Sequence, residues 1–248
     1  MENYFNNAIA GKKIIVTGGT TGIGRGIAIL LNSLGAKCLI CGRNQEQLDE
    51  TLAILNSANQ SESVGLTVDL ARAEEVKKLF EFADKELGEI DILINNAAIG
   101  YGSVLDGEYE DWQYVINTNL LAYLACSKEA IKRMEASGGG QIVNIGSMSA
   151  DVREEKSSVY VATKAGIQGF SDSLRKEINA KGIKLTLIEP GAVDTDMQEA
   201  PAAEKSKMIA NQEMIKAEDI ARAVMFCIAQ PEACEIVDLK IRPHMQII

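Results

Sequence analysis

Short apolar runs alternate along the chain with longer stretches in which apolar residues recur every three to four positions. A short apolar run between polar or glycine-rich segments is typical of a buried strand, and the three-to-four spacing is typical of an amphipathic helix. The pattern predicts strands at residues 12–18, 36–41, 63–68, 90–95, 140–147, 183–190 and 235–241. It predicts helices that begin near Gly22, Gln45, Arg72, Trp112, Ser157 and Ala217, with shorter pieces near Glu108 and within 200–215.

This alternation indicates parallel strands that are joined by helical crossovers. We therefore expect an α/β protein with a doubly wound, Rossmann-type, seven-stranded parallel sheet and helices on both faces. No linker or repeat interrupts the pattern, so we expect a single domain over residues 1–248. In such a sheet, ligands bind at the carboxyl ends of the strands.

The first predicted strand ends in a glycine-rich turn, and a predicted helix follows it directly. Gly18, Gly22 and Gly24 are spaced as Gly-x-x-x-Gly-x-Gly, which is one residue longer at the front than the usual dinucleotide fingerprint. The first glycine allows the turn, the second lets backbone approach a pyrophosphate, and the third lets the helix pack closely. Free N–H groups at the start of the helix favour phosphate. A tight turn with a purely structural role is the alternative.

Tyr160 and Lys164 stand four residues apart in a predicted helix, so their side chains share one face. A free phenol titrates near pH ~10, which is too high for efficient proton exchange at neutral pH. A cation about 4 Å away contributes roughly 4 kcal/mol at an effective dielectric constant of about 20, or about three pKa units before desolvation is counted. We therefore expect Lys164 to lower the pKa of Tyr160 and to make it an acid/base group.

These features belong to a set of motifs that resembles the short-chain dehydrogenase/reductase family in its compact form, close to the length of this 248-residue chain. The resemblance covers the chain from about Gly11 to Arg242. Motifs in this order and spacing are specific for the family but not for a substrate. They are the turn at 17–24, the Asn-Asn-Ala-Ala segment at 95–98, Asn119, Ser147, Tyr160 with Lys164, and the Pro190-Gly-x-Val193-x-Thr195 loop.

The resemblance implies a reaction in which a nicotinamide cofactor exchanges hydride with a carbonyl or alcohol carbon. Tyr160 would transfer the proton, Ser147 would donate a hydrogen bond to the substrate oxygen, and Lys164 would also hold the nicotinamide ribose. Asn119 would anchor a water that relays protons from Lys164 to solvent. Ser149 is the competing serine, but thirteen residues before the tyrosine is the usual family spacing and favours Ser147.

The resemblance also divides the chain into a cofactor half, about 11–145, and a catalytic and substrate half, about 146–248. Asp69 matches the residue that contacts the adenine amino group, although it could also cap a helix. The loop after residue 190 matches the segment that holds the nicotinamide carboxamide. The implied cofactor-binding residues are Gly18, Thr20, Thr21, Gly22, Ile23, Gly24, Arg43, Asp69, Leu70, Asn96, Ala97, Tyr160, Lys164, Pro190, Val193 and Thr195.

The end of the second predicted strand bears on the choice of cofactor. An NAD-selective site usually carries an acid here, which bonds the ribose 2′-hydroxyl. Gly42 occupies this position and Arg43 follows it, so no acid repels a 2′-phosphate and a guanidinium can bind one. Together with the resemblance, this favours NADP (NADPH) over NAD. A solvated arginine at the start of the next helix is the alternative.

Composition argues against several kinds of partner and site. The net charge of −10 argues against nucleic acid or an anionic membrane as a partner. The five cysteines do not make a disulfide framework, and Cys38 and Cys41 fall on opposite faces of a predicted strand. With His244 as the one histidine, we expect no metal site and no Ser-His-Asp hydrolase. The chain begins without an apolar leader, and we expect a soluble cytoplasmic protein.

We expect a small-molecule carbonyl or alcohol substrate, bound between the segments 150–158 and 196–214. Arg153, Lys156 and Lys205 are candidate contacts for an acidic substrate. The Arg242-Pro243 ending resembles that of relatives which act on 3-hydroxy acids and small polar carbonyls. The predicted function is therefore an NADP(H)-dependent oxidoreductase that interconverts a carbonyl and a secondary alcohol. The alternatives are an NAD(H)-dependent dehydrogenase of a small hydroxy acid and an NADP(H)-binding redox sensor without turnover.

Two predicted helices, at about 112–134 and 157–178, carry apolar residues on more than one side. One apolar face can pack on the sheet, and the other needs a partner. Family members pair these helices across a two-fold axis, so we expect a homotetramer, with a dimer as the alternative. The apolar residues concerned are Leu120, Leu121, Leu124, Val161, Ile167 and Phe170.

Overall fold

The computed structural model describes residues 7–58, 62–198 and 200–247. Seven strands form one parallel sheet in the order β3-β2-β1-β4-β5-β6-β7. This order confirms the predicted doubly wound α/β fold, and each observed strand lies within a predicted one except β2, which ends one residue later, at Gly42. The observed strands are β1 (Lys13–Thr17), β2 (Lys37–Gly42), β3 (Val64–Thr67), β4 (Ile92–Asn95), β5 (Gly140–Ile145), β6 (Ile183–Pro190) and β7 (Asp238–Ile241).

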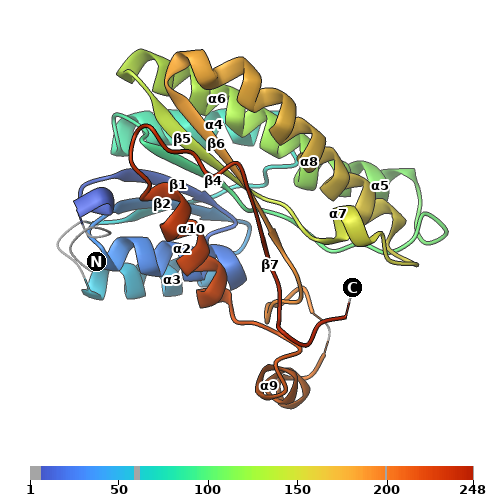
Figure 1. The fold of residues 1–248 in the computed structure, drawn as a ribbon. Coiled ribbons are helices and arrows are strands. Elements are labelled where there is room, and N and C mark those ends of the chain that lie inside the picture. The colour runs from blue at the N-terminus through green and yellow to red at the C-terminus, as the bar shows by residue number, and fades with distance from the viewer. Residues whose placement is uncertain (1–6, 59–61, 199, 248) are drawn as a thin grey trace.

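Helices cover both faces of the sheet (Figure 1). One face carries α2 (Gly22–Ser33), α3 (Gln45–Ala58) and α10 (Ala217–Ile228). The other carries α4 (Ala73–Glu86), α6 (Ala122–Ser137) and α8 (Ser158–Ile178). Shorter helices are α7 (Ser149–Val152), η2 (Asn179–Lys181) and α9 (Ala202–Ala210). The single-domain organisation stays a prediction, which the continuous sheet supports.

Strands β1, β2 and β4 are mostly apolar without alternation because both of their faces are buried, whereas the edge strand β7 alternates between exposed charged residues and half-buried apolar ones. In β1, Ile14 and Val16 belong to the core under α2 and α10, whereas Ile15 belongs to the core under α4 and α6. Cys38 and Cys41 of β2 likewise fall in different cores, which confirms that this Cys-x-x-C pair faces two ways. Strand β1 pairs with β2 on one side and with β4 on the other. The chain builds the sheet outward from β1 through β2 to β3, and then crosses back and continues on the other side from β4. The carboxyl ends of β1 and β4 therefore flank the crevice where such folds bind ligands.

The predicted helix near Trp112 differs from the observed one in two ways. It starts three residues earlier, as α5 (Tyr109–Ile116), because Glu108 and Asp111 form a reciprocal capping box at its beginning. It then passes through a π-helical turn, η1 (Asn117–Leu121), before it continues as α6. The separate piece expected near Glu108 is thus the cap of the same helix.

The outward sides of these helices retain apolar side chains. Leu121 is 49% exposed and Ile116 is 41% exposed. In contrast, Ile167 is fully buried and Leu120 packs against it. Only part of the expected apolar set therefore faces outward. Among the described residues, no helix is long and apolar enough to cross a membrane.

Candidate active site

A cleft of about 1400 Å³ opens at the carboxyl ends of the strands. It brings together residues from distant parts of the sequence, because parallel strands end at one edge of the sheet. Of the residues predicted for the site, only Gly24 and Asn119 do not line it. Those that line it are Gly18, Thr20, Thr21, Gly22, Ile23, Arg43, Asp69, Leu70, Asn96, Ala97, Ser147, Tyr160, Lys164, Pro190, Val193 and Thr195.

The turn after β1 is shaped by its glycines. Gly18 has a φ of +62°, and a Cβ there would lie 2.8 Å from the backbone of Ala97. Gly24 lies behind the turn, where a Cβ would be 2.2 Å from the carbonyl oxygen of Gly18. Gly24 therefore acts through packing, as the fingerprint predicts. The start of α2 has no side-chain cap at Thr21, so its first N–H groups are available to a ligand.

The turn is held in place by two residues whose contacts the sequence did not reveal. The Oγ1 of Thr17 accepts hydrogen bonds from the backbone N–H groups of Asn96 at 2.9 Å and Ala97 at 3.1 Å. The side-chain amide of Asn96 donates to the carbonyl oxygens of Thr17 at 2.9 Å and Gly18 at 3.1 Å. Asn96 thus fixes the bend from the neighbouring strand end, in addition to lining the cleft.

At one end of the cleft, Arg43 and Asp69 are joined through Tyr114. The Nη1 of Arg43 donates to the Tyr114 hydroxyl at 2.8 Å, and this hydroxyl donates to Oδ2 of Asp69 at 3.2 Å. Arg43 is exposed and lines the cleft, so its other N–H groups remain available to an anion. The Oδ1 of Asp69 accepts from the N–H of Ala71, whereas the N-cap of α4 is Arg72, so Asp69 does not take the capping role considered for it. Tyr114 gave no sequence signal because its partners lie 71 and 45 residues away.

Ser147, Tyr160 and Lys164 line the cleft together. Ser147 follows β5, its Oγ accepts from the N–H of Ser149 at 3.1 Å, and its hydroxyl is close enough to the Tyr160 phenol to lower the pKa of that group. The competing Ser149 donates instead to the carboxylate of Glu154 at 3.1 Å. The geometry therefore favours Ser147. The ammonium of Lys164 lies 5.6 Å from the centroid of the Tyr160 ring and donates to the carbonyl oxygen of Ile145 at 3.0 Å.

The acid/base properties of this group differ from the expectation. Burial raises the pKa of Tyr160, the hydrogen bond from Ser147 opposes this shift, and the charge of Glu154 adds to it. Burial also lowers the pKa of Lys164 to about 8, and the charge of Glu189 opposes that shift. The prediction that Lys164 lowers the pKa of Tyr160 is therefore wrong for this structure. Desolvation exceeds the attraction, because both groups are deeply enclosed and the ammonium is directed at a carbonyl.

Asn119 is fully buried in the π-helical turn, away from the wall of the cleft. Its side chain pairs with the backbone of Ile99, accepting from the N–H at 2.8 Å and donating to the carbonyl at 2.8 Å. It also donates to the hydroxyl of Thr163 in α8 at 3.4 Å. Asn119 therefore ties the loop after β4, which forms one wall of the cleft, to the helix that carries Tyr160. Its proposed water-anchoring role stays a prediction.

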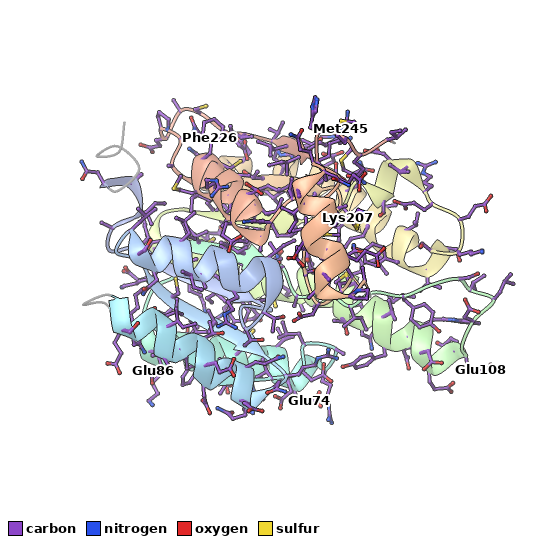
Figure 2. All side chains as sticks on the ribbon, turned by 90° about the horizontal axis from the view of Figure 1, so that it is seen from below. Glu74, Glu86, Glu108, Lys207, Phe226 and Met245 are labelled. Carbon is purple, nitrogen blue, oxygen red and sulfur yellow. The ribbon has the colours of Figure 1, made fainter. Side chains whose placement is uncertain are left out.

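The other wall comes from the loop after β6 and from the C-terminal segment. Figure 2 shows α9, marked by Lys207, beside the segment that carries Met245, whose N–H donates to the carbonyl of Gln212 at 2.9 Å. Gln246 lines the cleft and accepts from the N–H of Ala192 at 3.0 Å. The sequence gave no indication of this contact. Lys205 binds the carbonyl oxygen of Thr195 at 2.6 Å, so it holds the loop.

Of the three basic residues considered for an acidic substrate, only Lys156 lines the cleft. Lys205 also pairs with Asp194 at 3.5 Å, and the Nε of Arg153 donates to the carbonyl of Ala150 at 3.2 Å. Glu154 also lines the cleft, so the cleft carries charges of both signs. Among the described residues, no group of His, Cys, Asp and Glu side chains could hold a metal ion.

The cleft fits an elongated nucleotide. It extends from Arg43 past the uncapped start of α2 to Tyr160, and the glycine turn leaves space that a Cβ would fill. The residues present could therefore hold a nicotinamide dinucleotide, with a polar acid/base group at its far end.

Comparison with known proteins gives consistent matches. The model of the short chain dehydrogenase family matches residues 12–206. An uncharacterized oxidoreductase of Staphylococcus aureus strain USA300 is 33% identical over 233 residues, which cover 94% of this chain and 97% of the relative. Carbonyl reductase family member 4 of Danio rerio is 35% identical over 219 residues, or 88% of this chain and 91% of that protein.

Solved structures agree with these sequence matches. A metagenomic short-chain oxidoreductase, solved in complex with NADP, superposes with a TM-score of 0.83 at 25% identity. The match covers 96% of this chain and 100% of the metagenomic protein.

Proposed function

Because this chain belongs to the short-chain dehydrogenase family, we propose that it is an NADP(H)-dependent oxidoreductase that interconverts a carbonyl and a secondary alcohol. The observation that carries the proposal is that Ser147, Tyr160 and Lys164 line the same cleft as the glycine turn. The relative named as a carbonyl reductase supports this reaction class.

When bound, the nicotinamide cofactor supplies or accepts the hydride. Tyr160 donates its proton to the carbonyl oxygen, and Ser147 donates a hydrogen bond to the same oxygen. Lys164 holds its charge beside the phenol and is positioned by the carbonyl of Ile145. The raised pKa of Tyr160 keeps the phenol protonated at neutral pH, as reduction requires.

The proposed preference for NADP over NAD depends on Arg43 and on Gly42, which leaves no acid at the end of β2. Tyr114 fixes the position of the guanidinium at the edge of the cleft. The NADP in the metagenomic relative supports this choice. Thr20, Thr21 and the start of α2 would hold the phosphates, and the loop from Pro190 to Thr195 would hold the carboxamide.

We also propose a homotetramer, with a dimer as the alternative. The exposed Leu121 and Ile116 support a partner on the outer side of α5 and η1.

The decisive experiment is a panel of aldehydes, ketones and keto acids in which consumption of NADPH and of NADH is followed by absorbance. We expect turnover with NADPH and at least one carbonyl. Turnover only with NADH and a small keto acid would favour the hydroxy-acid alternative. Tight NADPH binding without turnover of any carbonyl would favour a redox sensor.

A further inference from the structure

A buried carboxyl group lies behind the candidate active site and has no part in the mechanism above. Glu189 is the residue before Pro190 in β6, and its side chain is 0% exposed. Its Oε2 atom has no hydrogen-bond partner among the residues that the structure describes. A buried acid is costly unless it is paired or has a function. The position of Glu189 therefore needs an explanation.

Glu189 faces α8, the helix that carries the acid/base pair. Gln168, one helical turn after Lys164, donates to Oε1 of Glu189 at 3.4 Å. The Cγ of Glu189 lies against Gly146, where a Cβ would approach it to 3.1 Å. Gly146 follows Ile145, whose carbonyl oxygen accepts from the Lys164 ammonium at 3.0 Å. Glu189 thus packs on the backbone that positions the lysine.

Charged groups approach Glu189 from three elements. From β7, the Nζ of Lys240 lies 3.6 Å from Oε2, and Asp238 lies nearby. From α7, Asp151 binds the same Lys240. From α8, Lys164 contributes the buried ammonium. Lys240 and Asp151 are 41% and 43% exposed, so the cluster extends from the interior to solvent.

These charges set the proton affinities of both buried groups. Burial and the charge of Asp238 raise the pKa of Glu189 to about 7, although Lys240 lowers it. The charge of Glu189 raises the pKa of Lys164, which burial has lowered to about 8. The carboxylate of Glu189 therefore favours the charged form of Lys164.

We propose that Glu189 is a positioning residue for Lys164, and that its buried carboxylate keeps the lysine in the ammonium form within a site that would otherwise discharge it. This inference rests on the proposed function, because it concerns the lysine of that reaction. Around Lys164, the described neighbours are a carbonyl and two aromatic rings, which stabilise an ammonium only weakly. Glu189 does not line the cleft, so it supplies charge without offering a second acid to the substrate.

The proton affinity of Lys164 can be measured without turnover. In protein labelled with carbon-13 at lysine Cε, the resonance of Lys164 should titrate near pH 8 and be missing from the Lys164→Met variant. In Glu189→Gln, which keeps the shape and removes the charge, we expect this midpoint to fall by about one pH unit. Glu235→Gln is the matched control, because this acid accepts from the N–H of Leu185 in the same strand, at 2.7 Å. The midpoint should not move in the control.

Lys240→Met tests the same idea from a half-exposed position, where the substitution leaves the core intact. Without Lys240 the carboxyl of Glu189 holds its charge less well, so the midpoint of Lys164 should fall, but less than in Glu189→Gln. An unchanged midpoint in folded Glu189→Gln overturns the proposal. If that variant does not fold, an unchanged midpoint in Lys240→Met overturns it.

Turnover supplies a second signature. With a carbonyl identified by the panel, Glu189→Gln should lower kcat/KM about fivefold at pH 8 and very little at pH 6, because a lysine that titrates one unit lower is mostly neutral at pH 8. An equal loss at every pH would indicate a structural role and contradict the proposal. If no carbonyl is turned over, the proposed function fails, and the lysine titration still decides the role of Glu189.

Discussion

Replacement of Arg43 tests the cofactor assignment most directly. In Arg43→Gln, the side chain keeps polar character but loses the charge that would meet a 2′-phosphate. A charge-assisted hydrogen bond of this kind contributes roughly 1.5 to 3 kcal/mol, which is about ten- to a hundredfold in affinity. We therefore expect the NADPH dissociation constant to rise by that factor, whereas the NADH constant should change little. The fold should tolerate the change, because Arg43 is exposed and, among the residues that the structure describes, its side chain bonds only to Tyr114.

The assay is a fluorescence titration of each cofactor at fixed salt, because electrostatic affinities depend on ionic strength. Arg25→Gln is the matched control. Arg25 lies in α2 and does not line the cleft, and its nearest acid is Glu50 at 3.9 Å. The same charge is lost from the protein, so a general electrostatic effect would weaken NADPH equally in both variants. That result, or a wild-type protein that prefers NADH, would refute the assignment.

The reverse design, which would convert the site to NAD, meets a steric obstacle. A Cβ on Gly42 would lie 2.5 Å from Oγ1 and 2.8 Å from Cγ2 of Thr20, which is itself buried. Gly42→Asp with Arg43→Gln should therefore weaken both cofactors. We expect inversion of the preference only when Thr20→Ala is added, and the ratio of the two dissociation constants is the quantity to compare.

Four further predictions follow from the site and the surface. Tyr160→Phe should lower turnover by at least about a hundredfold and leave NADPH binding almost unchanged, because the phenol acts in the transition state; equal activity would contradict its role. Gly24→Ala should weaken binding of both cofactors, since its Cβ would lie 2.2 Å from the carbonyl of Gly18; wild-type affinity would show that the turn can shift. Burial lowers the pKa of Lys164 from 10.5 to about 8, so the charged lysine should cost on the order of 3 kcal/mol of the free energy of unfolding at pH 7. That cost is fully present below pH 8 and disappears as pH rises toward 10.5, so inactive Lys164→Met should resist urea better than wild type at pH 7, with a smaller difference at pH 10. Light scattering should give a tetramer, or a dimer as the alternative, and Leu121→Glu should dissociate it; a wild-type mass near 26.8 kDa would exclude both.

The parts of the fold that were predictable from sequence are those with local signals. Strands buried on both faces read as continuous apolar runs, and the parallel order follows from their alternation with helices. Several motif residues then converge because they lie at or just after the end of a strand. Gly18, Ser147 and Pro190, which are far apart in sequence, line one cleft for this reason.

The contacts that the sequence did not reveal join segments that are distant along the chain. Tyr114 reaches Arg43 across 71 residues, and Gln246 reaches Ala192 across 54. The π-helical turn at 117–121 leaves the apolar spacing on both sides almost unchanged, so periodicity predicts one regular helix. By sequence, Lys205 is a candidate contact for an acidic substrate, but the fold of its loop directs it to the carbonyl of Thr195.

The pKa of Tyr160 shows why spacing alone cannot define an acid/base site. The spacing of Tyr160 and Lys164 correctly predicts one helix face and a charge near the phenol. It contains no information on the medium around them, and the sign of the shift depends on that medium. Here both groups are enclosed, so burial favours the neutral phenol and the neutral amine. A protonated phenol at Tyr160 suits reduction of a carbonyl at neutral pH. A neutral amine at Lys164, in contrast, would leave that phenol without a neighbouring cation. A site of this kind therefore needs a second, buried negative charge to keep the lysine charged, and β6 places Glu189 where it can supply one.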